Sequence, residues 1–178
     1  LSLMISTLTL FMWHKLVLHV GKKVTWGLGM LMNFVGIIGT SLLVPGENGF
    51  ISFLVAKIFI SLGFASFTIL MPSLLADIID YSTWKFGINR SATYFSIYTL
   101  MSKANFAIGG ALGLGIAGLC GFDPANTVHT EQSLLGLRFA IGYLPGFFIL
   151  LALVFIVLFP LDARRHSIIR RSLDTRAA

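Results

Sequence analysis

The chain has 178 residues, of which 56% are hydrophobic and 11% charged, and its mean hydropathy is +0.89. A soluble domain carries roughly 25% charged residues, so this composition excludes a soluble enzyme, a disordered chain and a coiled coil, and indicates a polytopic membrane protein. The formal net charge of +6 lies in short breaks between apolar runs rather than on one soluble face, so we expect no nucleic-acid partner.

Five apolar stretches follow one another along the chain, each long enough to cross a hydrocarbon core of about 30 Å. The predicted membrane helices cover residues 1–18, 24–44, 50–76, 92–119 and 134–159. We therefore predict an all-α bundle of about five spans over residues 1–161, followed by a basic cytoplasmic tail over residues 162–178. The first run begins at Leu1 without a charged leader, and we expect the chain to be the C-terminal part of a longer protein.

The basic residues are distributed unevenly over the breaks between these spans. Three of the 13 lie well inside spans, and the others lie in the third break, in the tail, or at the first break, with which we count Lys15 near the end of the first span. Because positive charge gathers on the cytoplasmic side, we expect a cytoplasmic C-terminus in a plasma membrane, or in the inner membrane of a bacterium. In the tail, Ile168, Ile169 and Leu173 alternate with arginines and predict an amphipathic helix on the inner leaflet.

The three basic residues inside the spans are Lys57, Lys103 and Arg138. The first and the last lie near the outer ends of their spans, where we interpret them as snorkelling to the interface. Lys103 lies much deeper, where a charge costs about 2.5–3.5 kcal/mol on insertion scales. Helical spacing places Ser96 and Thr99 on its face. We interpret this face as the wall of a wet substrate cavity; the alternative is a structural lysine paired with a neighbouring helix.

Glycine and proline in the third and fourth spans leave two explanations open. Gly109 and Gly113 have the small-xxx-small spacing that serves both static packing and the sliding contacts of a transporter. Pro72 removes a backbone hydrogen bond from the third span and marks either a gate or a tolerated kink. Phe64 and Phe67 suit sugar stacking, although contact with lipid or another helix is the commoner fate of a membrane phenylalanine.

A cluster of charges follows the third span at the membrane boundary. Asp77 and Asp80 have i, i+3 spacing, and Tyr81, Lys85 and Arg90 follow them. We interpret the five residues as a cytoplasmic gate, in which the two acids pair with basic residues of this segment or of a partner half. The alternative is a solvated loop that only sets the topology.

Enzyme and metal motifs are not found in the sequence. The four histidines have no ligand spacing, and neither a phosphate-binding loop nor a nucleophile motif is present. The single cysteine, Cys120, excludes an internal disulfide and a cysteine-based metal cage. We therefore expect no catalytic residues, no metal site and no resident cofactor.

The segment after the third span resembles a known family signature. It reads Asp77-Ile78-Ile79-Asp80-Tyr81-x-x-Trp84-Lys85-x-Gly87. This is similar to the DxxDY…WKxG signature between helices ten and eleven of the glycoside–pentoside–hexuronide:cation symporters, a family of the major facilitator superfamily that includes the melibiose carrier. The similarity continues through Lys103 to Pro124 in its specific part and covers nearly the whole chain.

The resemblance implies a transporter of two six-helix halves, of which this chain resembles helices eight to twelve. It implies symport of a sugar or glycoside by alternating access, coupled to Na⁺ or H⁺ that binds mostly in the N-terminal half. Lys103 corresponds to a lysine of the central polar network, and Thr68 to a sugar-contacting tryptophan. Because some relatives in this family move lysolipids, transport of a lipid-like solute is an alternative to transport of a sugar. A non-transporting sensor or scaffold on a carrier fold is the second class of function.

Overall fold

The computed structural model describes residues 2–43, 49–126 and 129–158, and every regular element among them is helical. The elements are α1 (Ser2–Val20), α2 (Lys22–Ser41), α3 (Gly49–Phe86), α4 (Ser91–Leu119), α5 (Glu131–Arg138), the π-helix η1 (Phe139–Tyr143) and α6 (Leu144–Leu158). The all-α class is therefore confirmed. The predicted tail over residues 162–178 lies outside the described residues.

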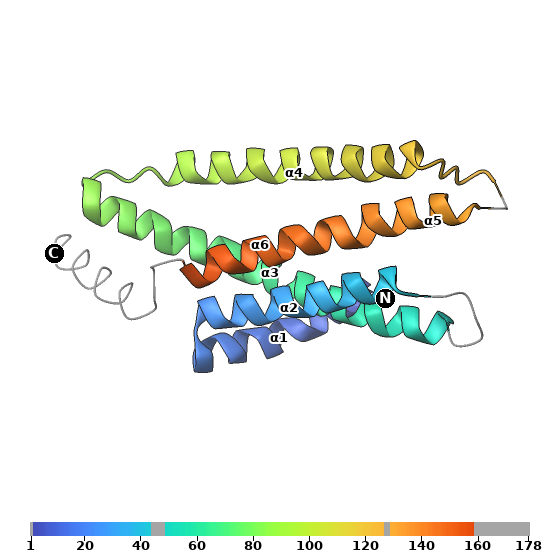
Figure 1. The fold of residues 1–178 in the computed structure, drawn as a ribbon. Coiled ribbons are helices and arrows are strands. Elements are labelled where there is room, and N and C mark those ends of the chain that lie inside the picture. Colours follow the sequence, from blue (N-terminus) through green and yellow to red (C-terminus); the bar gives the residue numbers. More distant parts are fainter. Residues whose placement is uncertain (1, 44–48, 127–128, 159–178) are drawn as a thin grey trace.

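Four helical stretches of the described chain are long and apolar enough to cross a membrane. They are α2, α3, α4 and the continuous run Glu131–Leu158 that α5, η1 and α6 form together. The helix α1 covers most of the first predicted span but is not among these four. The helices run up and down, so that the α1–α2 turn, the α3–α4 connection and the end of α6 lie at one end of the molecule (Figure 1).

The helix α3 is longer than the span predicted for it. The sequence predicts a polar break from Asp77 to Ser91, but the helix continues to Phe86. Nothing between these positions interrupts it until Gly87, which has a φ of +70° and donates its backbone N–H to the carbonyl of Thr83 at 2.9 Å. A glycine in this left-handed conformation is a common helix C-terminus. The two acids, whose i, i+3 spacing is that of one helical face, and Lys85 therefore lie on α3, and the alternative of a loop does not apply to them.

The tightest seam joins α2 to α3, where small residues let the two backbones approach. A Cβ at Gly36 would lie 2.7 Å from the carbonyl oxygen of Ala56, and a Cβ at Gly63 would lie 2.5 Å from that of Gly29. Trp13 on α1 is buried and donates its indole N–H to the carbonyl of Leu62 on α3 at 3.1 Å. The core of the described chain therefore lies around α3.

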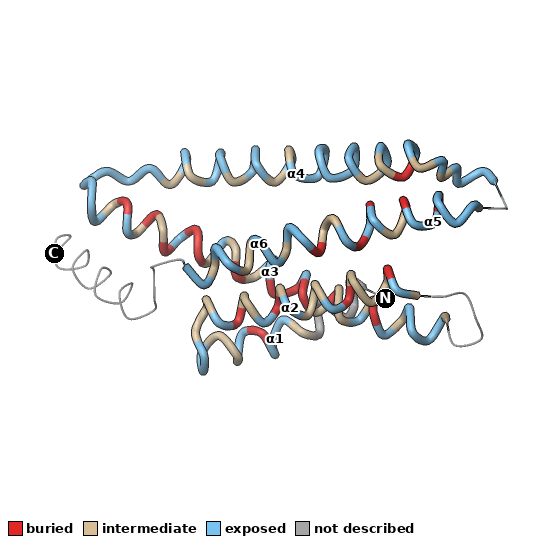
Figure 2. The backbone as a smooth tube through the Cα atoms, viewed as in Figure 1, coloured by how far each residue is buried: buried red, intermediate tan, exposed pale blue. Residues whose placement is uncertain are grey.

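The helix α4 lies at the margin of this bundle, along α5 and η1 and beside the end of α3 (Figure 1). Ala117 is its single buried residue, and Figure 2 shows most of its length exposed. Gly109 and Gly113 have nothing within 4 Å of the position that a Cβ would take. The packing predicted for these glycines is not made within the described part of the chain.

Candidate functional site

Three polar residues of α4 share one open hollow of about 460 Å³. Its lining is Phe95, Ser96, Thr99, Leu100 and Lys103. The helix repeat thus brings Ser96 and Thr99 to the same hollow as Lys103, two turns and one turn from it. All five residues belong to α4, so the described chain supplies one wall of this open hollow.

The chemistry of this wall is that of a hydrogen-bonding surface with one cation. Lys103 is exposed, and no described side chain forms an ion pair or a hydrogen bond with its ammonium. The Thr99 hydroxyl donates to the carbonyl of Phe95 at 2.8 Å, which leaves its oxygen able to accept another hydrogen bond. The arrangement can donate to hydroxyl or carboxylate oxygens, or complete an ion pair with an acid on another helix.

Thr68, the fourth residue predicted for the cavity, does not line this hollow. It is exposed on α3, and its hydroxyl donates to the carbonyl of Phe64 at 2.8 Å. Phe64 and Phe67 are also exposed there, with ring centroids 6.4 Å apart and ring planes inclined by 37°. Thr68 therefore lies beside an aromatic pair on α3 rather than with the polar row of α4.

Asp77 forms an ion pair that the sequence interpretation did not include. Its two carboxylate oxygens lie 2.7 and 2.8 Å from the ammonium of Lys22, the first residue of α2. The Asp77 side chain is 10% exposed and that of Lys22 is 31% exposed. The predicted partners were Lys85, Arg90 or another half of the protein. The pairing differs because Asp77 is buried where α3 packs against α2, whereas Lys85 and Arg90 are exposed further along the chain.

The remaining predicted gate residues extend along the exposed end of α3. Asp80 is half-buried one turn after Asp77. The ammonium of Lys85 lies 5.9 Å from the ring centroid of Tyr81 and 5.5 Å from that of Phe86, within the range of cation–π attraction. Arg90 is exposed at the position before α4. The structure gathers these residues at one end of the molecule, but it places Lys85 over aromatic rings rather than beside an acid.

Two basic residues make interhelical contacts that sequence reasoning missed. Lys23 donates to the carbonyl of Val157 at 2.9 Å and joins the start of α2 to the end of α6. Arg138, interpreted as snorkelling, donates to the carbonyl of Leu43 at 3.0 Å. The last carbonyl groups of a helix have no intrahelical donor. This general property was the only feature of the sequence that could have suggested these two contacts. Spacing alone could not assign these donors to particular helix ends.

The π-helix η1 is a further feature without a sequence prediction. Gly142 lies so close to the buried Ser41 of α2 that a Cβ would overlap its hydroxyl. Leu144 donates its backbone N–H to the carbonyl of Phe139, five residues earlier. Single π-turns inside α-helices occur often at functional sites. Here the turn lies where the last membrane helix meets α2 and α4.

Comparison with known proteins adds a family match to this geometry. Residues 1–163 match the family described as MFS/sugar transport protein. An uncharacterized symporter of Synechocystis is 27% identical over 94% of this chain and 31% of its own length. The glucuronide carrier protein homolog of Escherichia coli is 30% identical over 90% of this chain and 35% of its own length. The sodium-dependent lysophosphatidylcholine symporter 1 of Xenopus tropicalis is 27% identical, over 95% of this chain and 32% of its length. The chain thus spans about a third of these relatives.

Proposed function

The chain belongs to the MFS/sugar transport protein family, and we propose that the whole protein is a cation-coupled symporter of a sugar or glycoside. The membership confirms the resemblance to the melibiose-carrier-like symporters and makes the chain part of a multi-pass membrane transporter, not an enzyme. The proposed mechanism is alternating access between two helical halves, with the solute site between them. This chain then supplies part of the C-terminal half.

The polar row of α4 is the observation that carries this proposal. A lysine deep in a membrane span is costly unless water or a partner reaches it. Lys103 opens onto a hollow together with Ser96 and Thr99, and these groups suit the hydroxyls of a sugar. We propose that the N-terminal half supplies the facing wall and most of the site for the coupling Na⁺ or H⁺.

The proposed cytoplasmic gate now separates into two parts. Because α2 and α3 belong to the same half, an ion pair between them does not need to break when the two halves of a transporter move apart. We propose that the Lys22–Asp77 pair holds these two helices together within one half. Tyr81, Lys85 and Arg90 are exposed and remain able to contact the other half. In this proposal Asp80, Tyr81, Lys85 and Arg90 close the cytoplasmic side of the solute path, and the ion pair between Lys22 and Asp77 holds α3 in position for them.

Uptake by the full-length protein in proteoliposomes tests the proposal. The probes are radiolabelled melibiose and a glucuronide, each under an imposed Na⁺ or H⁺ gradient. We expect cation-dependent uptake of at least one probe, its loss in Lys103→Met, and its retention in Lys57→Met, which removes the other lysine inside a span. Coupled uptake that survives Lys103→Met would remove the assignment. Binding of a probe without uptake or counterflow would indicate a sensor instead.

A lipid-like solute is the second candidate, and the similarity to a lysophosphatidylcholine symporter favours it. Two apolar side chains, Phe95 and Leu100, line the hollow beside the polar row, so an amphipathic solute also finds matching groups. The same proteoliposomes with labelled lysophosphatidylcholine distinguish the two solutes. Lipid uptake in the absence of sugar uptake would replace the sugar in the proposal and leave the role of Lys103 in place.

A further inference from the structure

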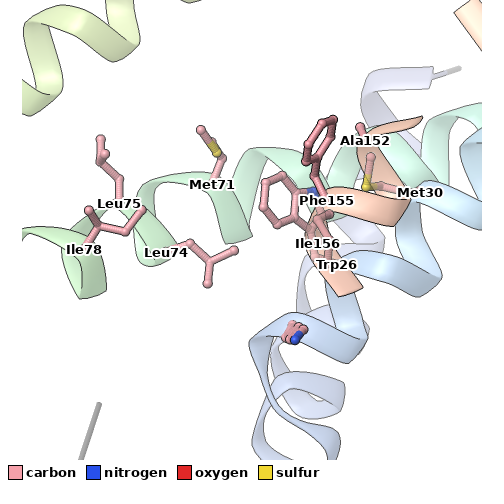
Figure 3. A pocket seen from close by; sticks show the side chains of 10 residues that line it. Trp26, Met30, Met71, Leu74, Leu75, Ile78, Ala152, Phe155 and Ile156 are labelled. Atoms are coloured by element: carbon pink, nitrogen blue, oxygen red, sulfur yellow. The ribbon is translucent and has the colours of Figure 1, made fainter. Parts of the chain in front are cut away.

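A second hollow, of about 350 Å³, lies between α2, α3 and α6 and shares no residue with the hollow on α4. Figure 3 shows Trp26, Met30 and Phe155 gathered on one side of it and Leu75 and Ile78 along α3 on the other. Lys23 is the only charged residue among those that line it. The hollow is therefore apolar with one cationic end, unlike the polar row proposed for the solute.

The dimensions of this hollow suit part of an acyl chain. Its lining on α2 extends from Lys23 to Met30, which is about 10 Å along a helix at 1.5 Å per residue. The lining on α3 covers a stretch of the same length, from Ile78 back to Met71. Methionine side chains are flexible and fit irregular apolar ligands. In a membrane protein, the occupant that matches such walls is hydrocarbon.

The cationic end of the hollow suits an anionic headgroup. The ammonium of Lys23 lies at the start of α2 and reaches the carbonyl of Val157 at the end of α6. The first turn of α2 contains no acid, and Gly21 provides no side-chain cap for its amide groups. The amide groups at a helix start attract phosphate, and basic pockets between membrane helices hold anionic lipid headgroups. Trp26, one turn deeper, is of the residue type that favours the headgroup level.

We propose that this hollow binds one anionic phospholipid, with an acyl chain against Met30, Met71 and Phe155 and its phosphate at Lys23 and the first turn of α2. The bound lipid is not the transported solute, because its site shares no residue with the polar row of α4. It bridges α2, α3 and α6, the three helices that line the hollow. The proposal goes beyond the transport activity and does not depend on which solute is moved.

Fluorescence quenching by brominated lipids tests this site in the full-length protein. The protein is reconstituted in phosphatidylcholine nanodiscs that contain a small fraction of brominated phosphatidylglycerol or, for comparison, of brominated phosphatidylcholine. The signal of Trp26 is the difference between the parent protein and its Trp26→Phe variant. One lysine near a lipid surface contributes about 1 kcal/mol, so we expect an affinity for phosphatidylglycerol about fivefold higher than for phosphatidylcholine.

Two variants and a matched control separate a built site from the general lipid annulus. Lys23→Gln removes the headgroup contact and should abolish the preference, and Ala152→Phe fills the hollow and should abolish the quenching of Trp26 by either lipid. Lys15→Gln removes an exposed lysine of α1 that does not line the hollow, and should leave the preference unchanged. Equal quenching by both lipids in the parent protein overturns the proposal. The proposal is also overturned if Lys15→Gln loses the preference for phosphatidylglycerol as fully as Lys23→Gln does. Stronger quenching of Trp26 after removal of residues 162–178 would overturn it as well, because that result would identify the tail as the occupant of the hollow.

Discussion

Lys22, at the start of α2, and Asp77, inside α3, form an ion pair between the two helices. Asp77 is 10% exposed, so its carboxylate requires a partner close by. Lys22 supplies one with both oxygens within 2.8 Å and also lies 3.5 Å from the carbonyl of Ser73. The pair therefore fixes the start of α2 against α3.

A double-mutant cycle measures this pair. Asp77→Asn and Lys22→Met should each lower the stability of the detergent-solubilised protein, and the double variant should lose less than the sum of the two. Because the pair is partly exposed, we expect a coupling energy of about 1–2 kcal/mol, between the values for exposed and buried pairs. Thermal unfolding followed by tryptophan fluorescence provides the readout. Additive losses would show that the two side chains do not stabilise each other.

Lys103 shows how much the sequence reveals at a single position. Its depth in an apolar span and its spacing from Ser96 and Thr99 predict one shared face, and these residues do line one hollow. The partner of Asp77 is not predictable in the same way. Several lysines and arginines lie near the same boundary, and only the packing of α2 on α3 selects Lys22.

The apolar runs of the sequence predict where the helices lie, but some helices end at other residues than the predicted spans do. The helix α3 continues ten residues beyond the predicted membrane span 50–76, because charged residues mark the limit of an apolar span but do not end a helix. Gly87 with its positive φ ends α3 instead. The π-helix Phe139–Tyr143 has no prediction from the sequence, and its Gly142 lies against Ser41 of α2, a contact between distant residues that no local pattern records.

The seam between α2 and α3 gives a prediction at the scale of these elements. Gly36→Ala places a methyl group 2.7 Å from a backbone oxygen of α3 and should destabilise the protein by about 1–3 kcal/mol through overpacking. Gly39→Ala is the matched control one turn away, because its Cβ would lie 3.6 Å from that of Ala56 in ordinary contact. We expect this control to be neutral, or stabilising by up to about 1 kcal/mol from helix propensity.

Thermal unfolding of the two alanine variants in the same detergent checks this difference. A lower melting temperature for Gly36→Ala alone supports the close approach of α2 and α3. Equal melting temperatures for both variants would show that the two helices lie further apart than these distances require.

At the scale of the whole molecule, α4 is the candidate membrane span with the smallest buried share among the described residues. A Cβ added at any of its glycines would meet no atom of another helix within 4 Å, its polar row opens onto a hollow with one wall, and only Ala117 is buried. The chain spans about a third of the relatives it matches, and we propose that the partner of this surface belongs to the remaining length. We therefore assign α4 to the boundary between the two halves of a transporter.

The proposed boundary exposes the Lys103 face of α4 to water and shields the other faces of this helix from water. Ile108 provides the comparison, since it is exposed in the described chain and lies about 140° around the helix from Lys103, at about 100° per residue. In a Cys120→Ser background, cysteine at position 103 should lie on the solute path and cysteine at position 108 should not.

Thiol labelling of Lys103→Cys and Ile108→Cys, in the full-length protein in membranes, tests this placement of α4 with a membrane-impermeant reagent. We expect Lys103→Cys to react with the reagent, whereas Ile108→Cys resists it. If neither cysteine reacts and the Lys103→Cys protein still inserts normally, position 103 faces acyl chains, and α4 does not line a solute path.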